Sequence, residues 1–123
     1  MSFLRAMGST NIKVSALGLG SVKFGRNQGV KYPNSFTIPD DNSVRNLLAQ
    51  ANELGINFID TAPAYGNSEE RIGALLTKRQ DWIISTKIGE EFIDAESFFD
   101  FSAAHTQLSV ERSLKRLKTD YLD

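Results

Sequence analysis

Short apolar segments alternate with helical segments along this chain, and this order constrains the fold more than any other feature. The apolar segments are typical of buried strands and lie at 16–21, 56–60 and 82–87. Apolar residues with helical spacing follow each of them, at 41–54, 68–76 and 102–117. Strands that alternate with helices form βαβ units, so the sequence predicts an α/β fold with a parallel sheet.

Three further segments complete this outline. Runs 3–7 and 12–15 flank the turn residues 8–11, which predicts a hairpin. The long segment 22–39 is rich in Gly, Asn and Lys, and loops of this length in compact domains are often functional. Residues 120–123 are expected to open a fourth strand.

Local signals mark the ends of the helices. Asp40 or Asp41 is expected to cap the first helix, and Gly55 is expected to end it. Ser68 and Ser102 are the expected caps of the second and third helices. One side of the third helix is expected to carry Ala103, Gln107, Val110, Leu114 and Leu117.

Composition excludes several classes of protein. The 123 residues include 14 Lys and Arg against 15 Asp and Glu, whereas a dedicated nucleic-acid binder has a clear basic excess. The acids of 90–100 and the bases of 112–118 are typical of solvated helix surfaces. Without Cys there is no disulfide and no thiolate ligand, and we expect no metal site. No segment approaches the ~18 apolar residues of a membrane helix, so we expect a soluble cytoplasmic protein.

Asp60, Tyr65 and Lys87 follow two neighbouring strands of the predicted sheet. Asp60 ends the strand at 56–60, Tyr65 lies in the loop after it, and Lys87 ends the strand at 82–87. The carboxyl ends of parallel strands open on one face, where the sites of such folds lie. Consecutive βα units usually pair, so we expect the three side chains to converge on one pocket.

These residue types suit proton donation to a carbonyl oxygen. A phenol has a reference pKa of ~10, too high for ready donation at neutral pH. A nearby ammonium favours the phenolate, and a carboxylate keeps a buried lysine charged. We therefore expect Tyr65 to be a general acid with Lys87 and Asp60 as its partners. Singly, each has an ordinary interpretation: Asp60 as a cap or turn residue, Tyr65 as a packing residue, Lys87 as a solvated side chain.

Several motifs resemble the aldo-keto reductase family. The stretch 55–69, Gly-Ile-Asn-Phe-Ile-Asp-Thr-Ala-Pro-Ala-Tyr-Gly-Asn-Ser-Glu, follows the family's pattern of a glycine, a short apolar strand, Asp-Thr-Ala, two residues, Tyr-Gly and then Ser-Glu. Ser85-Thr86-Lys87 matches the family's lysine strand, and 110–117 with 119–123 is similar to its third helix and fourth strand. Residues 7–25 resemble its bottom-capping hairpin and first strand.

The resemblance implies a (β/α)₈ barrel that reduces aldehydes and ketones to alcohols with hydride from NADPH. Residues 1–123 would then be the N-terminal portion of a single barrel domain, with a hairpin before the barrel and the chain ending in strand 4. The implied partners are the cofactor NADP(H) and a small carbonyl substrate, with no nucleic acid and no membrane.

Matching positions carry the family's roles onto this chain. They imply Tyr65 as the proton donor, Lys87 as the partner that lowers its pKa, and Asp60 as the carboxylate that pairs the lysine. Gly20, Ser21 and Asp60 resemble positions near the nicotinamide and its ribose.

Departures from the family pattern bear on activity. Val22 stands where many members have an aromatic residue or Met, so that wall of the pocket is smaller. The family's fourth catalytic residue is a histidine just after the fourth strand. The single histidine here, His105, falls in the third predicted helix and is expected to be an ordinary surface residue. The segments that grip the adenosine phosphate belong to the family's C-terminal half, so we expect these 123 residues alone to be inactive.

Two other hypotheses remain open. The chain could be a non-catalytic half-barrel module that binds a nucleotide or regulates another chain by pairing with it, as in the redox-sensing channel subunits of the family. It could also be an unrelated flavodoxin-like domain, although no glycine loop for phosphate is visible after Gly20. A barrel cut within strand 4 would expose strand edges, so we expect self-association through those edges.

Overall fold

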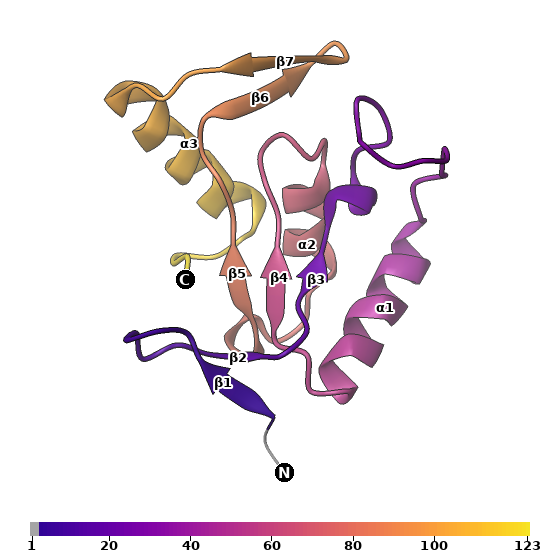
Figure 1. Ribbon diagram of the computed structural model, residues 1–123, viewed down its shortest axis with the longest axis vertical. Coiled ribbons are helices and arrows are strands. Elements are labelled where there is room, and N and C mark those ends of the chain that lie inside the picture. The colour runs from indigo at the N-terminus through magenta and orange to yellow at the C-terminus, as the bar shows by residue number, and fades with distance from the viewer. Residues whose placement is uncertain (1–2) are drawn as a thin grey trace.

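The computed structural model describes residues 3–123, and a sheet of three parallel strands forms its centre. In their order across the sheet these are β3 (Leu19–Gly20), β4 (Phe58–Asp60) and β5 (Ile83–Ser85) (Figure 1). Gly20 pairs with Asp60, and Asp60 in turn with Ser85. The three strands therefore end level with one another, so that side chains following them meet on one face.

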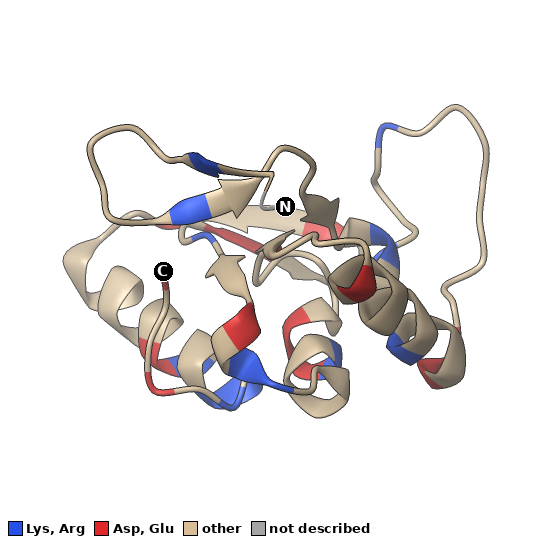
Figure 2. Ribbon diagram, turned by 90° about the horizontal axis from the view of Figure 1, so that it is seen from below, with Lys and Arg blue, Asp and Glu red and all other residues tan. Residues whose placement is uncertain are grey.

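Three helices lie on one side of this sheet, and the core lies between them and the strands (Figure 2). They are α1 (Asp41–Glu53), α2 (Ser68–Leu75) and α3 (Ala103–Arg116) (Figure 1). The buried apolar cluster joins the middle of the strands to the helices and includes Ile59, Ile84, Val44, Leu48, Ile72 and Leu75. Each buried aliphatic side chain contributes roughly 1.5–3 kcal/mol, so this cluster holds the layers together. Acidic and basic residues are interspersed along the helices (Figure 2).

The opposite side of the strands carries a second, smaller contact. Phe58 points away from the cluster, and its ring covers Gly18, where an added Cβ would come within 2.6 Å of the ring. Gly18 therefore accommodates the ring because it has no side chain.

The predicted N-terminal hairpin is confirmed. β1 (Leu4–Ala6) pairs antiparallel with β2 (Lys13–Ser15), and the hairpin crosses beneath the sheet (Figure 1). Asn57, at the start of β4, ties it in place: its Oδ1 accepts from the Ser15 amide at 2.7 Å and its Nδ2 donates to the Lys13 carbonyl at 3.0 Å.

The ends of α1 and the start of α3 follow the sequence signals. The Asp40 carboxylate accepts from the Ser43 amide at 2.8 Å, and this hydrogen bond lowers the pKa of Asp40 below its usual value. Gly55, just past the end of α1, has φ +83°, a conformation that glycine adopts without strain. The Ser102 hydroxyl accepts from the His105 amide at 3.2 Å and caps α3.

The expectation that Ser68 caps the second helix is wrong. Asn67 is the N-cap of α2, and its side chain makes no capping hydrogen bond. Ser68 is the first residue of the helix and is buried. It does not cap the helix because its hydroxyl bonds to Ser21 and Thr61 instead.

The residues expected along one side of α3 do not share one degree of burial. Ala103 and Gln107 are exposed, whereas Ser109, Ser113 and Leu117 are buried. The physical reason is the close approach of α2. At Gly73 an added Cβ would lie 2.1 Å from the Arg116 carbonyl oxygen, so α2 and the end of α3 meet here without space for a side chain at position 73.

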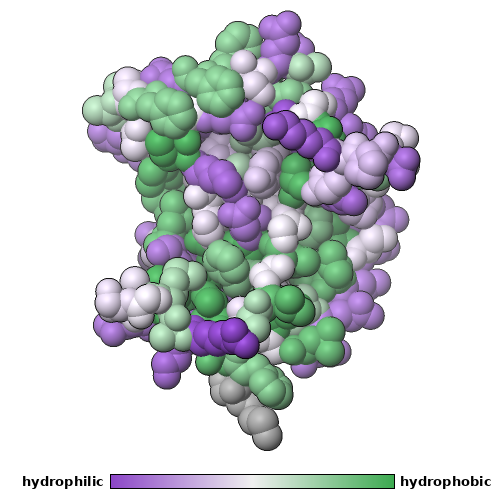
Figure 3. Space-filling view, in the orientation of Figure 1, coloured by the Kyte–Doolittle hydropathy of each residue, from purple (hydrophilic) through white to green (hydrophobic). Residues whose placement is uncertain are grey.

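A second hairpin occupies the acidic segment that the sequence assigned to a solvated helix surface. β6 (Glu90–Ile93) pairs antiparallel with β7 (Glu96–Phe99). Asp94 and Ala95 form its two-residue turn with φ +51° and +63°. Two positive φ values suit the twist of a tight hairpin, although Gly and Asn are the usual residues there. Hydrophobic side chains gather over this part of the molecule (Figure 3), where Phe98, Phe99 and Phe101 are exposed.

Residues 120–123 run beside β5, as expected of a fourth strand, but carry no regular ladder. The Asp123 amide donates to the Ile84 carbonyl at 3.3 Å, and Asp123 Oδ2 accepts from the Ile84 amide at 3.0 Å. Among residues 3–123, no helix has the length and apolar character needed to cross a membrane. The same residues contain no group of three or more His, Cys, Asp or Glu that could hold a metal ion.

Candidate active site

β4 and β5 lie side by side with their carboxyl ends level, and this brings Asp60 and Lys87 together. Asp60 is the last residue of β4, and Lys87 lies two residues beyond the end of β5. Lys87 Nζ donates to Asp60 Oδ1 at 3.0 Å, to Asp60 Oδ2 at 2.8 Å and to the Thr61 carbonyl oxygen at 3.0 Å. The side chains of Lys87 and Asp60 are 47% and 39% exposed, so a ligand can reach this ion pair.

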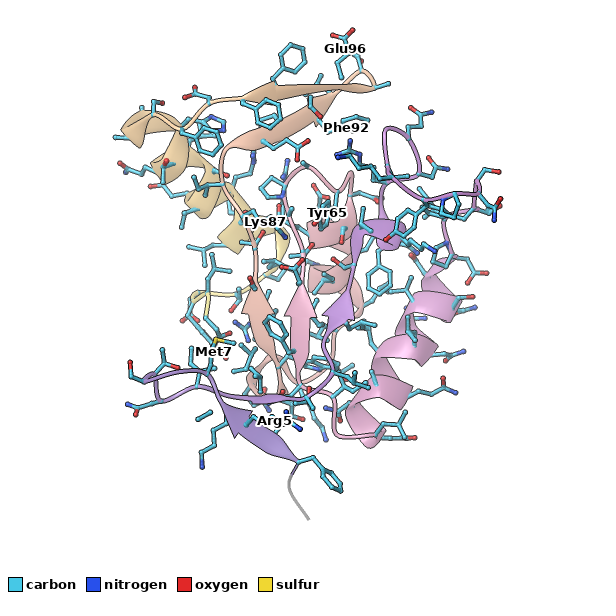
Figure 4. The ribbon with its side chains drawn as sticks, viewed as in Figure 1. Arg5, Met7, Tyr65, Lys87, Phe92 and Glu96 are labelled. Carbon is cyan, nitrogen blue, oxygen red and sulfur yellow. The ribbon has the colours of Figure 1, made fainter. Side chains whose placement is uncertain are left out.

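Tyr65 completes the cluster from the loop after β4. Lys87 Nζ lies 4.9 Å from the centroid of the half-buried Tyr65 ring, and both side chains lie above the ends of the strands (Figure 4). The loop is held by hydrogen bonds from the Tyr65 amide to the Ala62 carbonyl at 3.1 Å and from the Ser68 amide to the Tyr65 carbonyl at 3.1 Å. The structure therefore brings together the three side chains expected to converge.

The surroundings of Lys87 favour its charged form. Partial burial alone would lower the pKa of Lys87, but interactions with Asp60, and then with Tyr65, outweigh that effect. The pKa of Lys87 is consequently raised above its ordinary value, and the ammonium is charged at neutral pH.

Gly20 and Ser21 lie at the end of β3, beside Asp60, but only one of them is open. Gly20 is exposed, and an added Cβ would meet nothing within 4 Å. Ser21 is fully buried, and its hydroxyl donates to the Asp60 carbonyl oxygen at 2.8 Å. A ligand can thus approach the Gly20 backbone, whereas the Ser21 side chain is enclosed by the protein.

A buried cluster of hydroxyls explains why Ser21 is enclosed. Ser68 Oγ lies 2.9 Å from Ser21 Oγ and 3.0 Å from Thr61 Oγ1. These three residues fix the ends of β3 and β4 against the start of α2, because buried polar groups without partners are costly. Sequence reasoning missed this role for Thr61 and Ser68, although both fall in the stretch 55–69 that it singled out.

A hollow opens beside Tyr65. Its volume is about 410 Å³, and its lining includes Val22, Arg26, Tyr32, Tyr65 and Glu90. Val22 begins the short 3₁₀ helix η1 (Val22–Phe24), and Tyr32 belongs to the long segment 22–39 that the sequence marked as functional. A larger hollow of about 650 Å³ lies between the N-terminal hairpin and the end of α1, away from Lys87. The smaller hollow is the candidate substrate site because it reaches Tyr65.

Comparison with known proteins decides the family. A family model described as "Aldo/keto reductase family" matches residues 16–123. The chain belongs to the aldo-keto reductase family. Its Asp60, Tyr65 and Lys87 all lie within the matched residues.

Several known proteins are similar to nearly the whole length of this chain. The L-galactose dehydrogenase of Arabidopsis thaliana is 40% identical over 126 residues, which are 98% of this chain and 36% of the relative. A Pseudomonas aeruginosa protein whose crystal structure is described as that of an aldo-keto reductase is 59% identical in sequence, with a TM-score of 0.88. The match covers 98% of this chain and 44% of that one. An aldo-keto reductase of Bacillus halodurans in its holo form is 33% identical with TM-score 0.81, over 100% of this chain and 39% of that one.

These similarities confirm the fold class. The similar structures are (β/α)₈ barrels, and this chain corresponds to the N-terminal part of such a barrel with its preceding hairpin. The chain spans only 36% of the length of the Arabidopsis L-galactose dehydrogenase.

Glu69 is a further residue near the site whose importance the sequence did not reveal. It is buried, its Oε1 lies 3.1 Å from Arg116 Nη1, and its Oε2 accepts from the Thr86 hydroxyl at 2.9 Å. Thr86 precedes Lys87, so this buried carboxylate anchors the backbone that carries the lysine. Its partners lie far along the sequence, and only the Ser-Glu motif hinted at Glu69.

His105 is not the ordinary surface residue that the sequence predicted. It is half-buried between α3 and β6, and its Nε2 lies 3.1 Å from Glu91 Oε1. Its partner is thus Glu91 of the second hairpin rather than a member of the Asp60–Tyr65–Lys87 cluster.

Proposed function

We propose that the protein containing this chain reduces aldehydes and ketones to alcohols, with NADPH as the hydride source and Tyr65 as the proton donor. The observation that carries the proposal is the position of Lys87. Its ammonium bonds to both oxygens of Asp60 and lies 4.9 Å from the Tyr65 ring centroid. A charged lysine beside a phenol favours the phenolate and so makes the phenol a better proton donor at neutral pH.

The roles of the side chains follow from the balance of the reaction. Reduction adds a hydride to the carbonyl carbon and a proton to the carbonyl oxygen. Tyr65 holds that proton and donates it, which leaves a negative charge on the phenol oxygen. Lys87 stabilises this charge, and Asp60 keeps Lys87 protonated and oriented. The substrate carbonyl would bind with its oxygen toward the Tyr65 hydroxyl.

Gly20 and Asp60 are the proposed contacts of the cofactor. When bound, the nicotinamide would supply the hydride. The open space at Gly20 and the half-exposed Asp60 carboxylate beside it fit a flat ring and a ribose hydroxyl. The enclosed Ser21 side chain does not fit as a direct ligand, so we propose that Ser21 supports this site from beneath. We propose NADPH rather than NADH as the cofactor because the resemblance to the family implies it.

We infer a small carbonyl compound as the substrate. The hollow beside Tyr65 has a volume of about 410 Å³, and polar side chains in its lining suit a compound with hydroxyl groups. The name of the Arabidopsis relative, L-galactose dehydrogenase, makes sugars the first compounds to test. We place the reaction in the cytoplasm, which cell fractionation would test.

The test is cofactor oxidation by the whole protein with a panel of aldehydes, in parallel with Tyr65→Phe. We expect NADPH oxidation with the natural residue and a fall of ~10²-fold or more in kcat for Tyr65→Phe, with cofactor affinity unchanged. Tyr121→Phe, whose ring lies over Arg79 at the other end of the sheet, is the control and should keep its activity. Cofactor binding without turnover would instead support a regulatory module, and an active Tyr65→Phe would refute the assignment of the acid.

A further inference from the structure

The Arg26 side chain, which lines the hollow beside Tyr65, bonds both to the backbone of its own segment and to the loop that carries Tyr65. The residue is only 9% exposed. Its Nε donates to the Gln28 carbonyl at 2.8 Å and its Nη2 to the Gly29 carbonyl at 3.0 Å, both in its own segment. Its Nη1 donates to the carbonyl of Ala64 at 3.2 Å, which is the residue before Tyr65. A guanidinium buried this deeply is stable because carbonyl oxygens replace its water.

The second hairpin closes over the same guanidinium. Arg26 Cζ lies 3.7 Å from the centroid of the Phe92 ring in β6, and Phe92 lies above the loop of Tyr65 (Figure 4). Glu90, also in β6, places its Oε1 3.6 Å from Arg26 Nη1. Arg26 therefore connects β6 to the peptide that carries Tyr65.

The backbone beside Arg26 packs against the same loop without space for side chains. A Cβ added to Gly25 would lie 2.2 Å from the Tyr65 carbonyl oxygen. A Cβ added to Gly66, which has φ +59°, would lie 2.0 Å from the Gly25 carbonyl oxygen. Residues on both sides of Tyr65 are thus held by residues 25 and 26.

We propose that Arg26 is a positioning residue for Tyr65, which fixes the peptide of the phenol and ties it to β6. The effect on catalysis rests on the proposed role of Tyr65 as the acid, whereas the hold on the loop does not. Misplacement of a reacting group by about 1 Å can cost about 10²-fold in rate. Arg26 should therefore influence kcat although it is not placed to exchange a proton itself.

Arg79 offers a matched control at the other end of the sheet. Its guanidinium donates to the carbonyl oxygens of Trp82 at 2.6 Å and Tyr121 at 3.1 Å, and it lies 4.0 Å from the centroid of the Tyr121 ring. It precedes β5, whereas Lys87 follows it. Arg79→Gln thus removes a similar set of contacts without touching the Tyr65 loop.

The experiment compares Arg26→Gln, Arg26→Lys and Arg79→Gln in the whole protein by kinetics and by amide hydrogen exchange. For Arg26→Gln we expect kcat to fall by ~10- to 10²-fold with little change in KM, and exchange of the Tyr65 and Ser68 amides to accelerate about tenfold. Arg26→Lys keeps the charge but offers a single nitrogen in place of the three of the guanidinium, and should recover part of both effects. Arg79→Gln should leave kcat and those two amides unchanged.

Unchanged exchange at Tyr65 and Ser68 in a folded Arg26→Gln protein would overturn the proposal, and so would an equal effect of Arg79→Gln on kcat. If Arg26→Gln does not fold, Arg26→Lys decides by the same criteria. Faster exchange in a protein without any reductase activity would support the hold on the loop and refute the proposed function instead.

Discussion

Lys87 bonds to both carboxylate oxygens of Asp60, at 3.0 and 2.8 Å, across two neighbouring strands. Its third acceptor is the Thr61 carbonyl oxygen at 3.0 Å. An ammonium has three N–H donors, so these acceptors fix the position of the charge. Because Asp60 of β4 holds the ammonium of Lys87, which follows β5, the distance between this charge and the Tyr65 ring depends on how β4 and β5 are aligned.

Loss of the lysine should change how the reaction depends on pH. In Lys87→Met the phenol no longer has a cation beside it, so we expect kcat to fall by ~10²-fold or more and the alkaline limb of the pH–rate profile to move to higher pH. Asp60→Asn should have a smaller effect, since it acts through Lys87. Lys115→Met, an exposed lysine of α3, is the control. An unchanged profile in Lys87→Met would refute the mechanism.

The raised pKa of Lys87 predicts how this residue contributes to stability. A group whose pKa is raised on folding stabilises the protein fully below its unfolded pKa, here ~10.4. That contribution is lost as pH rises through the higher folded value. The difference in unfolding free energy between the natural protein and Lys87→Met should therefore shrink above about pH 10.5. The pair is partly exposed, so the change should be below ~1 kcal/mol. Urea titrations between pH 8 and pH 12 would measure it, and a constant difference would contradict it.

Gly20→Ala and Ser21→Ala should separate cofactor binding from stability. The Cβ of Gly20→Ala meets no protein atom within 4 Å, so we expect stability to change by less than ~0.5 kcal/mol while NADPH affinity falls. Ser21→Ala removes the buried hydrogen bonds of the Ser21 hydroxyl with the Asp60 carbonyl oxygen and with the Ser68 hydroxyl, and should cost about 1–3 kcal/mol with a smaller effect on affinity. Fluorescence titration with NADPH and urea unfolding give the two quantities. Equal affinities in Gly20→Ala and the natural protein would exclude the contact.

A polypeptide of residues 1–123 alone should self-associate through its sheet. β3 is one edge of the three-stranded sheet, and at the other edge residues 120–123 run beside β5 without a regular ladder. Strand edges with unpaired backbone groups invite pairing with other chains. We expect dimers or larger species in sedimentation experiments. The exposed Phe98 and Phe99 offer a rival explanation. If replacing both with Glu produced a monomer, the aromatic surface rather than the strand edges would be the interface.

Local signals in the sequence predicted those parts of the fold that local interactions determine. The first hairpin, the Asp40 and Ser102 caps and the glycine after α1 each depend on residues a few positions apart. The convergence of Asp60 and Lys87 could also be predicted, since neighbouring parallel strands must align their ends.

Features that depend on residues far apart in the sequence could not be predicted from local signals. The turn of the second hairpin uses Asp94 and Ala95 at positive φ, where the sequence offers neither Gly nor Asn. The buried face of α3 depends on Gly73 in another helix. Arg26 looks like any surface arginine until its bond to the Ala64 carbonyl, 38 positions away, is known.

The absence of side chains at Gly25 and Gly66 also limits how this part of the molecule can move. With their backbones in direct contact, the start of the segment after β3 cannot swing as a separate lid over Tyr65. Any displacement there would carry Tyr65, the proposed proton donor, with it, and we expect it to interrupt the proposed reaction. If the segment moves when a substrate binds, we expect the motion in the part beyond Gly29, around Tyr32.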